Sequence, residues 1–391
     1  MHVVMVAHSF PRQPGDVAGH FIWELAEALA ARGHAVTAIA PADRGEMGAP
    51  TLGRVAVRRV RYAPPSRETL AYGGTMHRRA GRDPLAAVTF AALVRSFARA
   101  VAAECRAAPV DLVHAHWWVP AGLATRLADR AGRPFLVTLH GTDVALARTV
   151  PGGRLLMRWV LRRSAAVTAV SSSLAAAAAK ITGRAATDIA VEPMPLAPAA
   201  PAAQAPRREG AVFVGRLTTQ KHVADLLEAL ALLGRRGAAL HLTVVGDGPE
   251  RTVLERRAAS ADLAGMVSFT GMVPPDTVPA HLAGKRVCVL PSVDEGLGLV
   301  VAEALVAGVP VVAARSGGIP DLLTDPEAGT LVPPDDPAAL ADAIQLVASD
   351  DRYLAGAARA GRALRSRLSP DAVAQRFEEI YRAALAGRSR A

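Results

Sequence analysis

Short apolar runs alternate along the chain with longer segments in which apolar side chains recur every three or four residues. A short run bounded by turn residues is typical of a buried parallel strand, and the longer spacing is typical of an amphipathic helix. The runs predicted as strands are 2–8, 35–40, 55–62, 111–116, 134–139, 166–170 and 189–191, then 211–214, 241–245, 267–272, 287–291 and 310–314. This alternation predicts an α/β fold of parallel sheets covered by helices.

One stretch rich in Pro and Ala interrupts the alternation at residues 193–210. Such a composition is typical of a linker. The chain has 391 residues, which is enough for two domains of ordinary size. We therefore expect a first domain at 1–195, a linker at 196–210 and a second domain at 211–369, followed by a helix within 370–391.

The formal net charge of +10 changes the range of partners to consider. A basic chain attracts anionic substrates, membrane surfaces or nucleic acid. The sequence carries no signature of a nucleic-acid-binding module, so we expect no nucleic-acid partner. Anionic substrates and an anionic membrane surface are the partners that remain to be considered. Arg158, Arg162 and Arg163 are expected on one helix as a solvated or membrane-facing stripe.

The two cysteines, Cys105 and Cys288, fall in different predicted domains and have no partner at metal-binding spacing. They indicate buried free thiols in a reducing compartment. The first residues read as a strand and not as a secretory signal. The apolar window 297–314 contains Glu303 and is broken by glycine and proline, so it does not predict a membrane span. We expect a cytoplasmic chain that contacts the inner face of a membrane peripherally.

Two glutamates, Glu295 and Glu303, lie eight residues apart around the turn that follows the strand at 287–291. The helix predicted to start near Gly298 presents free N–H groups and a positive dipole end, which suit a phosphate. Carboxylates only accept hydrogen bonds, so they suit sugar hydroxyls better than phosphate oxygens. The alternative is a capped core helix with one buried, paired Glu. Glu303 interrupts an apolar run, and burial of an unpaired carboxylate is costly, so the functional interpretation is favoured.

Two cations, Arg216 and Lys221, follow the strand at 211–214 five residues apart. A guanidinium fork and an ammonium point charge at one sheet edge suit a diphosphate. The alternative is a pair of exposed surface cations. After the next strand, Gly246-Asp247-Gly248-Pro249 allows close backbone approach and predicts Pro249 at the first position of a helix.

His140-Gly141-Thr142-Asp143 follows the strand at 134–139, at the edge where open α/β sheets bind ligands. A histidine there can hydrogen-bond a sugar hydroxyl or move a proton, and the alternative is a satisfied structural histidine. Trp117 and Trp118 end the preceding strand. They could stack on an acceptor ring or pack in the core.

Other segments give weaker signals. The loop ending at Gly19 lacks G-x-G-x-x-G, so no dinucleotide cofactor is predicted. His114 and His116 share one face of a strand, yet no third zinc ligand is near, so no metal is predicted. Residues 63–83 are rich in Pro, Gly and Arg and are expected to form a surface loop that shapes the acceptor site.

Four segments, in this order, resemble the retaining glycosyltransferases of the GT-B fold, family 4. They are the loop at Gly19, the H-G-T-D segment at 140–143, the G-R-L segment at 215–217 with Lys221, and the E-x7-E motif at 295–303. The resemblance implies two Rossmann-like domains facing each other across a cleft, with the final helix crossing back to the first domain. It also implies that the first domain binds the acceptor and the second a nucleoside-diphosphate sugar, with UDP as the expected nucleotide.

The resemblance also implies roles for individual residues. The expected catalytic residues are His140, Arg216, Lys221 and Glu295. The expected donor-site residues are Gly19, Gly215, Arg216, Lys221, Gly246, Gly271, Met272, Glu295, Gly296, Leu297, Gly298, Leu299 and Glu303. The expected acceptor contacts are Asp16, Trp117, Trp118 and Asp143. No metal and no cofactor beyond the donor substrate are expected, because the cations and the helix dipole would stabilise the departing diphosphate.

Two other classes of function stay open. One is a GT-B enzyme of different chemistry, such as a nucleotide-sugar epimerase or a phosphorylase. The other is a non-catalytic, basic, membrane-associated binding protein that has kept the fold. Neither alternative accounts as directly for the joint presence of Arg216, Lys221, Glu295 and Glu303.

Overall fold

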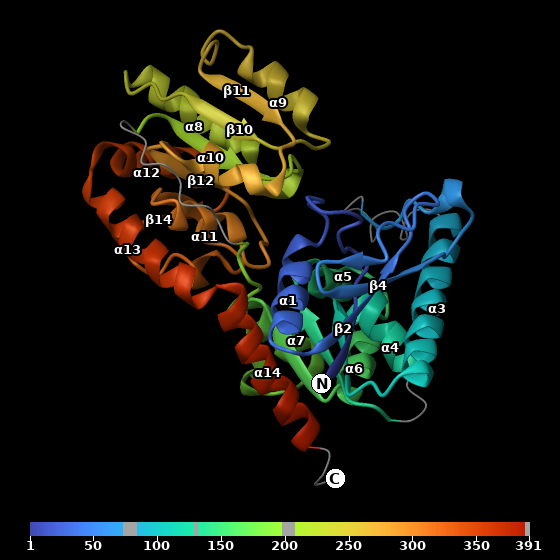
Figure 1. Cartoon of the computed structure of the whole chain (residues 1–391). Coiled ribbons are helices and arrows are strands. Elements are labelled where there is room, and N and C mark those ends of the chain that lie inside the picture. Colours follow the sequence, from blue (N-terminus) through green and yellow to red (C-terminus); the bar gives the residue numbers. More distant parts are fainter. Residues whose placement is uncertain (73–83, 129–131, 198–207, 388–391) are drawn as a thin grey trace. The chain divides into compact units, whose positions relative to one another are not determined.

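The computed structural model describes residues 1–72, 84–128, 132–197 and 208–387 (Figure 1). Its internal contacts divide the chain into two units. Unit 1 comprises Met1–Pro195 together with Pro370–Ala391, and unit 2 comprises Leu196–Ser369. Most of the predicted linker, and the part of the predicted acceptor loop at 73–83, lie outside the described residues.

Unit 1 is built on an eight-stranded sheet of order β3-β4-β2-β1-β5-β6-β7-β8. Its strands are β1 (His2–Val6), β2 (Ala35–Pro41), β3 (Thr51–Leu52), β4 (Val55–Val60), β5 (Leu112–His116), β6 (Phe135–Leu139), β7 (Ala166–Ala169) and β8 (Ile189–Val191). All neighbours pair in parallel except the short edge strand β3, which pairs antiparallel with β4. The central strands are buried on both faces, which is why they read as unbroken apolar runs.

The helices of unit 1 follow the strands in the order expected of a wound α/β fold. They are α1 (His20–Ala31), α3 (Pro84–Ala107), α4 (Leu123–Ala128), α5 (Thr142–Thr149), α6 (Gly153–Arg163), α7 (Ser172–Thr182) and α14 (Pro370–Ala386). In the described part of the chain, Leu85–Ala107 of α3 is the one helix long and apolar enough to cross a membrane. It packs on β2, β4 and α4 as one of the layers of unit 1, and a third of it is buried.

Helix α14 belongs to unit 1 although it follows the whole of unit 2 in the sequence, and it lies beside α1 (Figure 1). Its apolar stripe places Phe377 and Tyr381 fully inside the core. The Tyr381 hydroxyl lies 2.7 Å from Nδ1 of the buried His114 on β5. Glu378 accepts a hydrogen bond from Nε of Arg32 at 2.6 Å, just past the end of α1. One face of α14 therefore completes the core, and polar contacts fix its register against α1.

Unit 2 is a six-stranded, fully parallel sheet of order β11-β10-β9-β12-β13-β14. Its strands are β9 (Ala211–Val214), β10 (Leu242–Val245), β11 (Val267–Gly271), β12 (Val287–Leu290), β13 (Val311–Ala314) and β14 (Gly329–Val332). Its helices are α8 (Val223–Arg235), α9 (Arg251–Ala258), α10 (Val278–Leu282), α11 (Leu299–Val306), α12 (Pro337–Ser349) and α13 (Arg352–Arg367). The predicted fold class, two Rossmann-like parallel-sheet units, is confirmed. Helix α9 begins at Arg251, so the prediction of Pro249 at its first position is wrong.

Candidate functional site

The order of strands in unit 2 points to one edge of its sheet. Strands β9 and β12 are neighbours, but the chain continues from β9 to β10 on one side and from β12 to β13 on the other. Parallel sheets bind ligands off the carboxyl ends of their strands at such a reversal point. The loop after β9 carries Arg216 and Lys221, and the loop after β12 carries Glu295. The predicted donor-site residues of two distant segments thus lie at the sheet edge where the strand order favours ligand binding.

The structure brings Lys221 and Glu295 into direct contact through Nζ and Oε1. Their side chains are 19% and 12% exposed, so the pair is partly shielded from water. The two loops are joined further by Gln220, whose side chain donates to the Asp294 carbonyl at 2.9 Å and whose own carbonyl accepts from Val293 N–H at 2.9 Å. Three contacts therefore hold the cation and the carboxylate in place before any ligand binds.

Glycines let the backbones around this edge pack without side chains. A Cβ on Gly246 would lie 2.0 Å from the Gly215 carbonyl oxygen, and Gly246 N–H donates to the Gly271 carbonyl at 2.9 Å. On the other side, a Cβ on Gly317 would lie 2.0 Å from the Glu295 carbonyl oxygen. The loops after β9, β10, β12 and β13 thus meet through bare backbone, and only glycine fits at 246 and 317. The side chain of Met272, just past β11, is 71% exposed.

Helix α11 begins at this edge. Gly298 is its N-cap residue at φ +81° and offers no side chain to cap the helix, so the first N–H groups are not satisfied by a capping side chain. Gly296 lies in the same turn, Leu297 is buried, and Leu299 is the first helical residue. Glu303 lies one turn into α11, on the side of Cys288 in β12. Burial, and then the Glu303 charge, raise the pKa of the Cys288 thiol to about 12.

Unit 1 places His140 in a cluster of rings at the carboxyl ends of β5 and β6. Its Nε2 lies 3.1 Å from Nδ1 of His116, and its ring centroid is 4.4 Å from that of Trp117. Burial, and then the neighbouring imidazoles, hold the pKa of His140 well below its usual range. Burial likewise lowers the pKa of His116 to about 3. His140 is therefore a neutral imidazole at pH 7, able to exchange a hydrogen bond but not to supply a charge.

The zinc alternative for the H-x-H pair fails on geometry. Both ring nitrogens of His114 are occupied, Nδ1 by the Tyr381 hydroxyl and Nε2 by Thr138 Oγ1 at 2.7 Å. Among the described residues, the one group of three potential metal ligands is His222, Asp225 and the exposed Asp335. It lies at the surface of unit 2, and nothing besides the cluster itself points to a metal there.

Asp143 and Trp118 build the turn instead of facing an acceptor. Asp143 is 2% exposed, and its Oδ1 accepts the backbone N–H groups of His140, Gly141 and Val144 at 3.0–3.2 Å. The Trp118 N–H reaches Oδ2 at 3.3 Å, and its indole nitrogen donates to the Asp143 carbonyl at 2.7 Å. Trp118 is also 2% exposed. Burial raises the pKa of Asp143 to about 6. The structure thus buries both side chains in contacts within unit 1, where neither is open to the acceptor contact that the sequence suggested.

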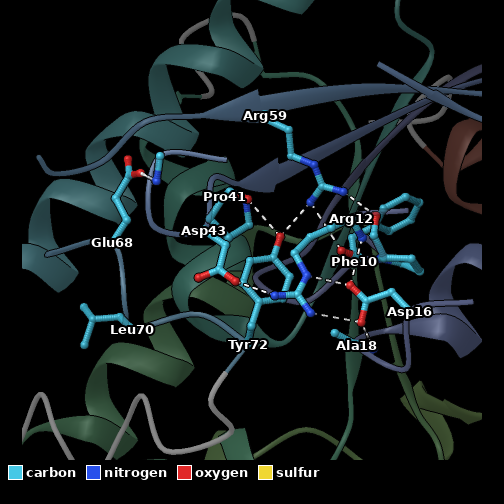
Figure 2. Close-up of polar contacts among 12 residues, drawn as sticks. Phe10, Arg12, Asp16, Ala18, Pro41, Asp43, Arg59, Glu68, Leu70 and Tyr72 are labelled. Carbon is cyan, nitrogen blue, oxygen red and sulfur yellow. Dashed lines mark hydrogen bonds and ion pairs between the residues drawn. The ribbon is translucent and has the colours of Figure 1, made fainter. Parts of the chain in front are cut away.

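Asp16 is likewise engaged within the first loop (Figure 2). Its carboxylate accepts from Nε of Arg12 at 2.6 Å and from the backbone N–H groups of Arg12 and Ala18 at 3.0 and 3.2 Å. Arg12 also contacts Asp43, and its guanidinium lies 4.9 Å from the Tyr72 ring centroid. Gly19 closes this loop, because a Cβ there would lie 2.2 Å from the Ser9 carbonyl oxygen.

The network around Asp16 extends to residues that the sequence did not single out. Arg59 on β4 donates to the Tyr72 hydroxyl at 2.6 Å, and that hydroxyl donates to the Pro41 carbonyl at 2.8 Å (Figure 2). Burial lowers the pKa of Arg59 and raises that of Tyr72. The available signal was the group of three arginines within the predicted strand at 55–62. The network shows that this loop is held by at least three segments of unit 1.

Comparisons with known proteins agree in both units. The family model described as glycosyl transferases group 1 matches residues 202–364, and the glycosyl transferase 4-like domain matches residues 18–195. The chain is 33% identical over 282 residues to a 2-deoxystreptamine glucosyltransferase of Streptomyces kanamyceticus, covering 65% of this chain and 72% of the relative.

Two further similarities bear on the nucleotide. The chain is 35% identical over 266 residues to a GDP-mannose-dependent alpha-(1-6)-phosphatidylinositol monomannoside mannosyltransferase of Mycolicibacterium smegmatis, covering 62% of this chain and 68% of the relative. A solved structure of Anabaena Alr3699/HepE in complex with UDP and glucose matches with a TM-score of 0.72 and 18% identity, covering 97% of this chain and 99% of that one. At that identity the structural likeness concerns the fold.

Proposed function

Because the chain belongs to the GT-B glycosyltransferases of family 4, we propose that it transfers the sugar of a nucleoside-diphosphate sugar to an acceptor hydroxyl with retention of configuration. The observation that carries the proposal is the preassembled edge of unit 2. There Lys221 contacts Glu295 beside the uncapped start of α11 and the glycine turns after β9 and β10. This edge combines cations, free N–H groups and carboxylates, which are the partners that a diphosphate linked to a sugar requires.

The proposed chemistry follows from the charge that develops on the leaving group. As the bond between the anomeric carbon and the diphosphate oxygen breaks, Arg216, Lys221 and the start of α11 stabilise the negative charge. The acceptor oxygen bonds to the same face of the anomeric carbon, and its proton passes to the departing phosphate oxygen. Configuration is then retained, and the charges on the protein take the place of a metal ion.

Two carboxylates are proposed to orient the donor, because carboxylates accept hydrogen bonds from hydroxyl groups. Glu295, at the turn, would hold sugar hydroxyls, and Glu303, one turn into α11, would hold the ribose hydroxyls. His140 is proposed to hydrogen-bond a sugar hydroxyl as a neutral imidazole. We propose UDP as the nucleotide, in line with the UDP complex of the structural neighbour. GDP is the direct competitor, since one relative is GDP-mannose-dependent.

The first experiment measures melting temperature with UDP, GDP, ADP, UDP-glucose and GDP-mannose, each first with Mg²⁺ and then with a chelator. A bound nucleotide stabilises the folded state by mass action, so UDP should raise the melting temperature most. The increase should vanish in Glu303→Ala and persist in Glu379→Ala, a matched change of an exposed glutamate on α14. A larger increase with GDP would overturn the assignment of the base.

Further outcomes test the donor site, the independence from metal and the retention of configuration. If no nucleotide stabilises the protein, the donor-site assignment is wrong. If chelator removes the stabilisation by UDP, the metal-independent mechanism is wrong. With an accepted acceptor, NMR of the first-formed product should show the anomeric configuration of the donor. A change in the nucleotide sugar without any acceptor would instead indicate an epimerase.

A further inference from the structure

One segment of unit 1 has an unusual charge pattern. Residues 144–187 contain no Asp or Glu, although the chain as a whole has 35 acidic residues. The same segment carries seven cationic side chains, which are Arg148, Arg154, Arg158, Arg162, Arg163, Lys180 and Arg184. The cations elsewhere in the described chain are often paired with carboxylates, as Arg32 is with Glu378. The nearest acidic residues in the sequence are Asp143 and Asp188 at its two ends, and Asp188 acts on Arg184, so the rest of the segment keeps a local excess of positive charge.

Helix α6, at the centre of this segment, has two apolar faces where a helix on the surface of a protein usually has one. Met157, Val160 and Leu161 are fully buried against the rest of unit 1. On the opposite side, Leu155 is 71% exposed and Trp159 is 42% exposed. Leu155 and Trp159 are four residues apart and therefore adjacent on the helix surface.

More apolar side chains surround this exposed face. Val150 at the end of α5, Leu156 on α6 and Leu127 on α4 are 43%, 38% and 53% exposed. Helix α6 contacts both α5 and α4. The exposed apolar side chains on and beside α6, centred on Leu155 and Trp159, are what we call the α6 surface. Exposed apolar side chains gathered in this way mark an interaction site.

Two hollows lie on either side of the central residues Leu155 and Arg158. One, of about 510 Å³, is lined by Arg148, Arg154, Leu155, Arg158, Ala177, Lys180 and Ile181. The other, of about 360 Å³, is lined by Arg126, Leu155, Arg158, Trp159, Arg162 and Arg163. Each hollow thus combines four cations with apolar side chains.

Two of the guanidiniums lack an acceptor where one would be expected. The buried Nε atoms of Arg126 and Arg158 have no hydrogen-bond partner among the described residues. The Arg126 guanidinium lies 4.4 Å from the Trp159 ring centroid, so it bridges the aromatic and cationic parts of the surface. A guanidinium beside an aromatic ring and other cations can bind a phosphate oxygen through its terminal N–H groups.

The combination of exposed apolar side chains and cations indicates which kind of partner the α6 surface binds. A soluble polyanion would engage the cations but would leave Leu155 and Trp159 in water. An apolar protein surface would bury Leu155 and Trp159 but would leave the seven cationic side chains of the two hollows unmatched. A bilayer containing anionic phospholipid satisfies both, because phosphate headgroups lie directly above acyl chains. Tryptophan beside arginine is also the composition typical of a helix that lies in the plane of the membrane interface.

We propose that the α6 surface docks on an anionic phospholipid bilayer. Leu155 and Trp159 enter the interface, and the cations of the two hollows bind lipid phosphates. The docking needs no sugar transfer, so it can be tested apart from the proposed enzymatic function.

The test is sedimentation of the full chain with two kinds of vesicle, phosphatidylcholine alone and equal parts of phosphatidylcholine and phosphatidylglycerol. Wild-type protein should bind the anionic vesicles and not the neutral ones, and added salt should release it. The triple change Arg158→Gln, Arg162→Gln and Arg163→Gln should weaken partitioning on the order of a hundredfold, since each cation near the surface contributes independently. Leu155→Ser should weaken it about tenfold by removing one inserted apolar side chain.

Matched controls on unit 2 separate a local surface from total charge. The triple change Arg235→Gln, Arg256→Gln and Arg362→Gln removes the same charge from exposed positions and should leave binding close to wild type. Leu346→Ser removes a leucine that is 47% exposed on α12 and should also have little effect.

Three results would overturn the proposal. One is that both triple variants lose binding equally, which would make the attraction a property of net charge. Another is that wild type fails to bind anionic vesicles. The third is that heparin captures the protein as well as vesicles do and Leu155→Ser changes neither, which would assign the surface to a polyanion. Melting curves of every variant, expected to match wild type, show that the exposed substitutions leave the fold intact.

Discussion

The contact between Lys221 and Glu295 predicts both the direction and the size of the change in UDP affinity when these residues are substituted. In the structure each side chain neutralises the other at the reversal point of the unit 2 sheet. A bound diphosphate would draw on the same ammonium group. Removal of the lysine should therefore do two things at once: it deletes a partner of the diphosphate, and it leaves an uncompensated carboxylate near the same anion.

The free-energy cost of the lost partner and that of the unpaired carboxylate can each be estimated. A hydrogen bond to a charged group contributes about 2 kcal/mol. A like charge several ångströms away, in surroundings that water screens in part, costs about 1 kcal/mol. Lys221→Met should then weaken UDP binding by about 3 kcal/mol, or roughly 150-fold. Glu295→Gln alone should change UDP affinity little, because UDP carries no sugar for the carboxylate to hold. The double variant should lose only about 2 kcal/mol, or roughly 30-fold.

Adding Glu295→Gln to Lys221→Met is thus expected to raise the affinity for UDP about fivefold. Isothermal titration of UDP into the wild type, the two single variants and the double variant measures this directly. Lys285→Met is the control, because Lys285 precedes β12 at the opposite end of the sheet, where its Nζ donates to Thr243 Oγ1 at 2.8 Å. The reasoning is refuted if the double variant binds no better than Lys221→Met, or if Lys285→Met is equally damaging.

Three further predictions concern the scaffold. Gly246→Ala should abolish stabilisation by UDP, since its Cβ would lie 2.0 Å from the Gly215 carbonyl oxygen. Gly237→Ala is the control for backbone strain alone, because Gly237 has a positive φ and open space around it, and this variant should still bind UDP. Glu378→Gln should destabilise the protein at pH 7 by about 2 kcal/mol. Arg32 holds the Glu378 pKa at about 2, below its ordinary 4.5, so this difference should disappear as urea unfolding is followed from pH 5 towards pH 2; a constant difference would disprove the linkage. For Asp143 the sign is opposite, because its pKa is raised from 3.8 to about 6. The stability of wild type relative to Asp143→Asn should fall by roughly 3 kcal/mol between those pH values and then level off, and an increase over that range would contradict the cause given.

The strands and helices could be predicted because each carries its own local pattern. The strands at 189–191 and 211–214 have the predicted bounds, and the other predicted strands differ by one or two residues. The edge in unit 2 was also accessible, because short strands followed by Arg216, Lys221 or Glu295 place those residues by topology alone. The start of α9 was wrong because proline suits several positions around a helix start, and here a further turn precedes Arg251.

The details of unit 1 could not be predicted, because they depend on contacts between distant segments. Trp118 and Asp143 satisfy each other across 25 residues, and no local pattern shows that this leaves both buried. His114 is satisfied by Tyr381, which is 267 residues away. Its alternation with His116 on one strand is compatible with a zinc site, although none was predicted because no third ligand is near in the sequence. Only the packed core distinguishes these cases.

The position of α14 has a consequence for how the protein is made. Phe377 and Tyr381 fill the core of unit 1, yet the ribosome synthesises them only after all of Leu196–Ser369. Domains commonly fold during synthesis in the order in which they emerge. Here the sheet of unit 1 emerges first but must wait for its last core helix, while unit 2 already has all of its strands. A nascent chain therefore carries an incomplete first unit through most of translation, and His114 stays without its hydroxyl partner until α14 arrives. A protein interrupted before residue 370 would keep every residue of the edge formed by Lys221 and Glu295 and still lack a finished unit 1.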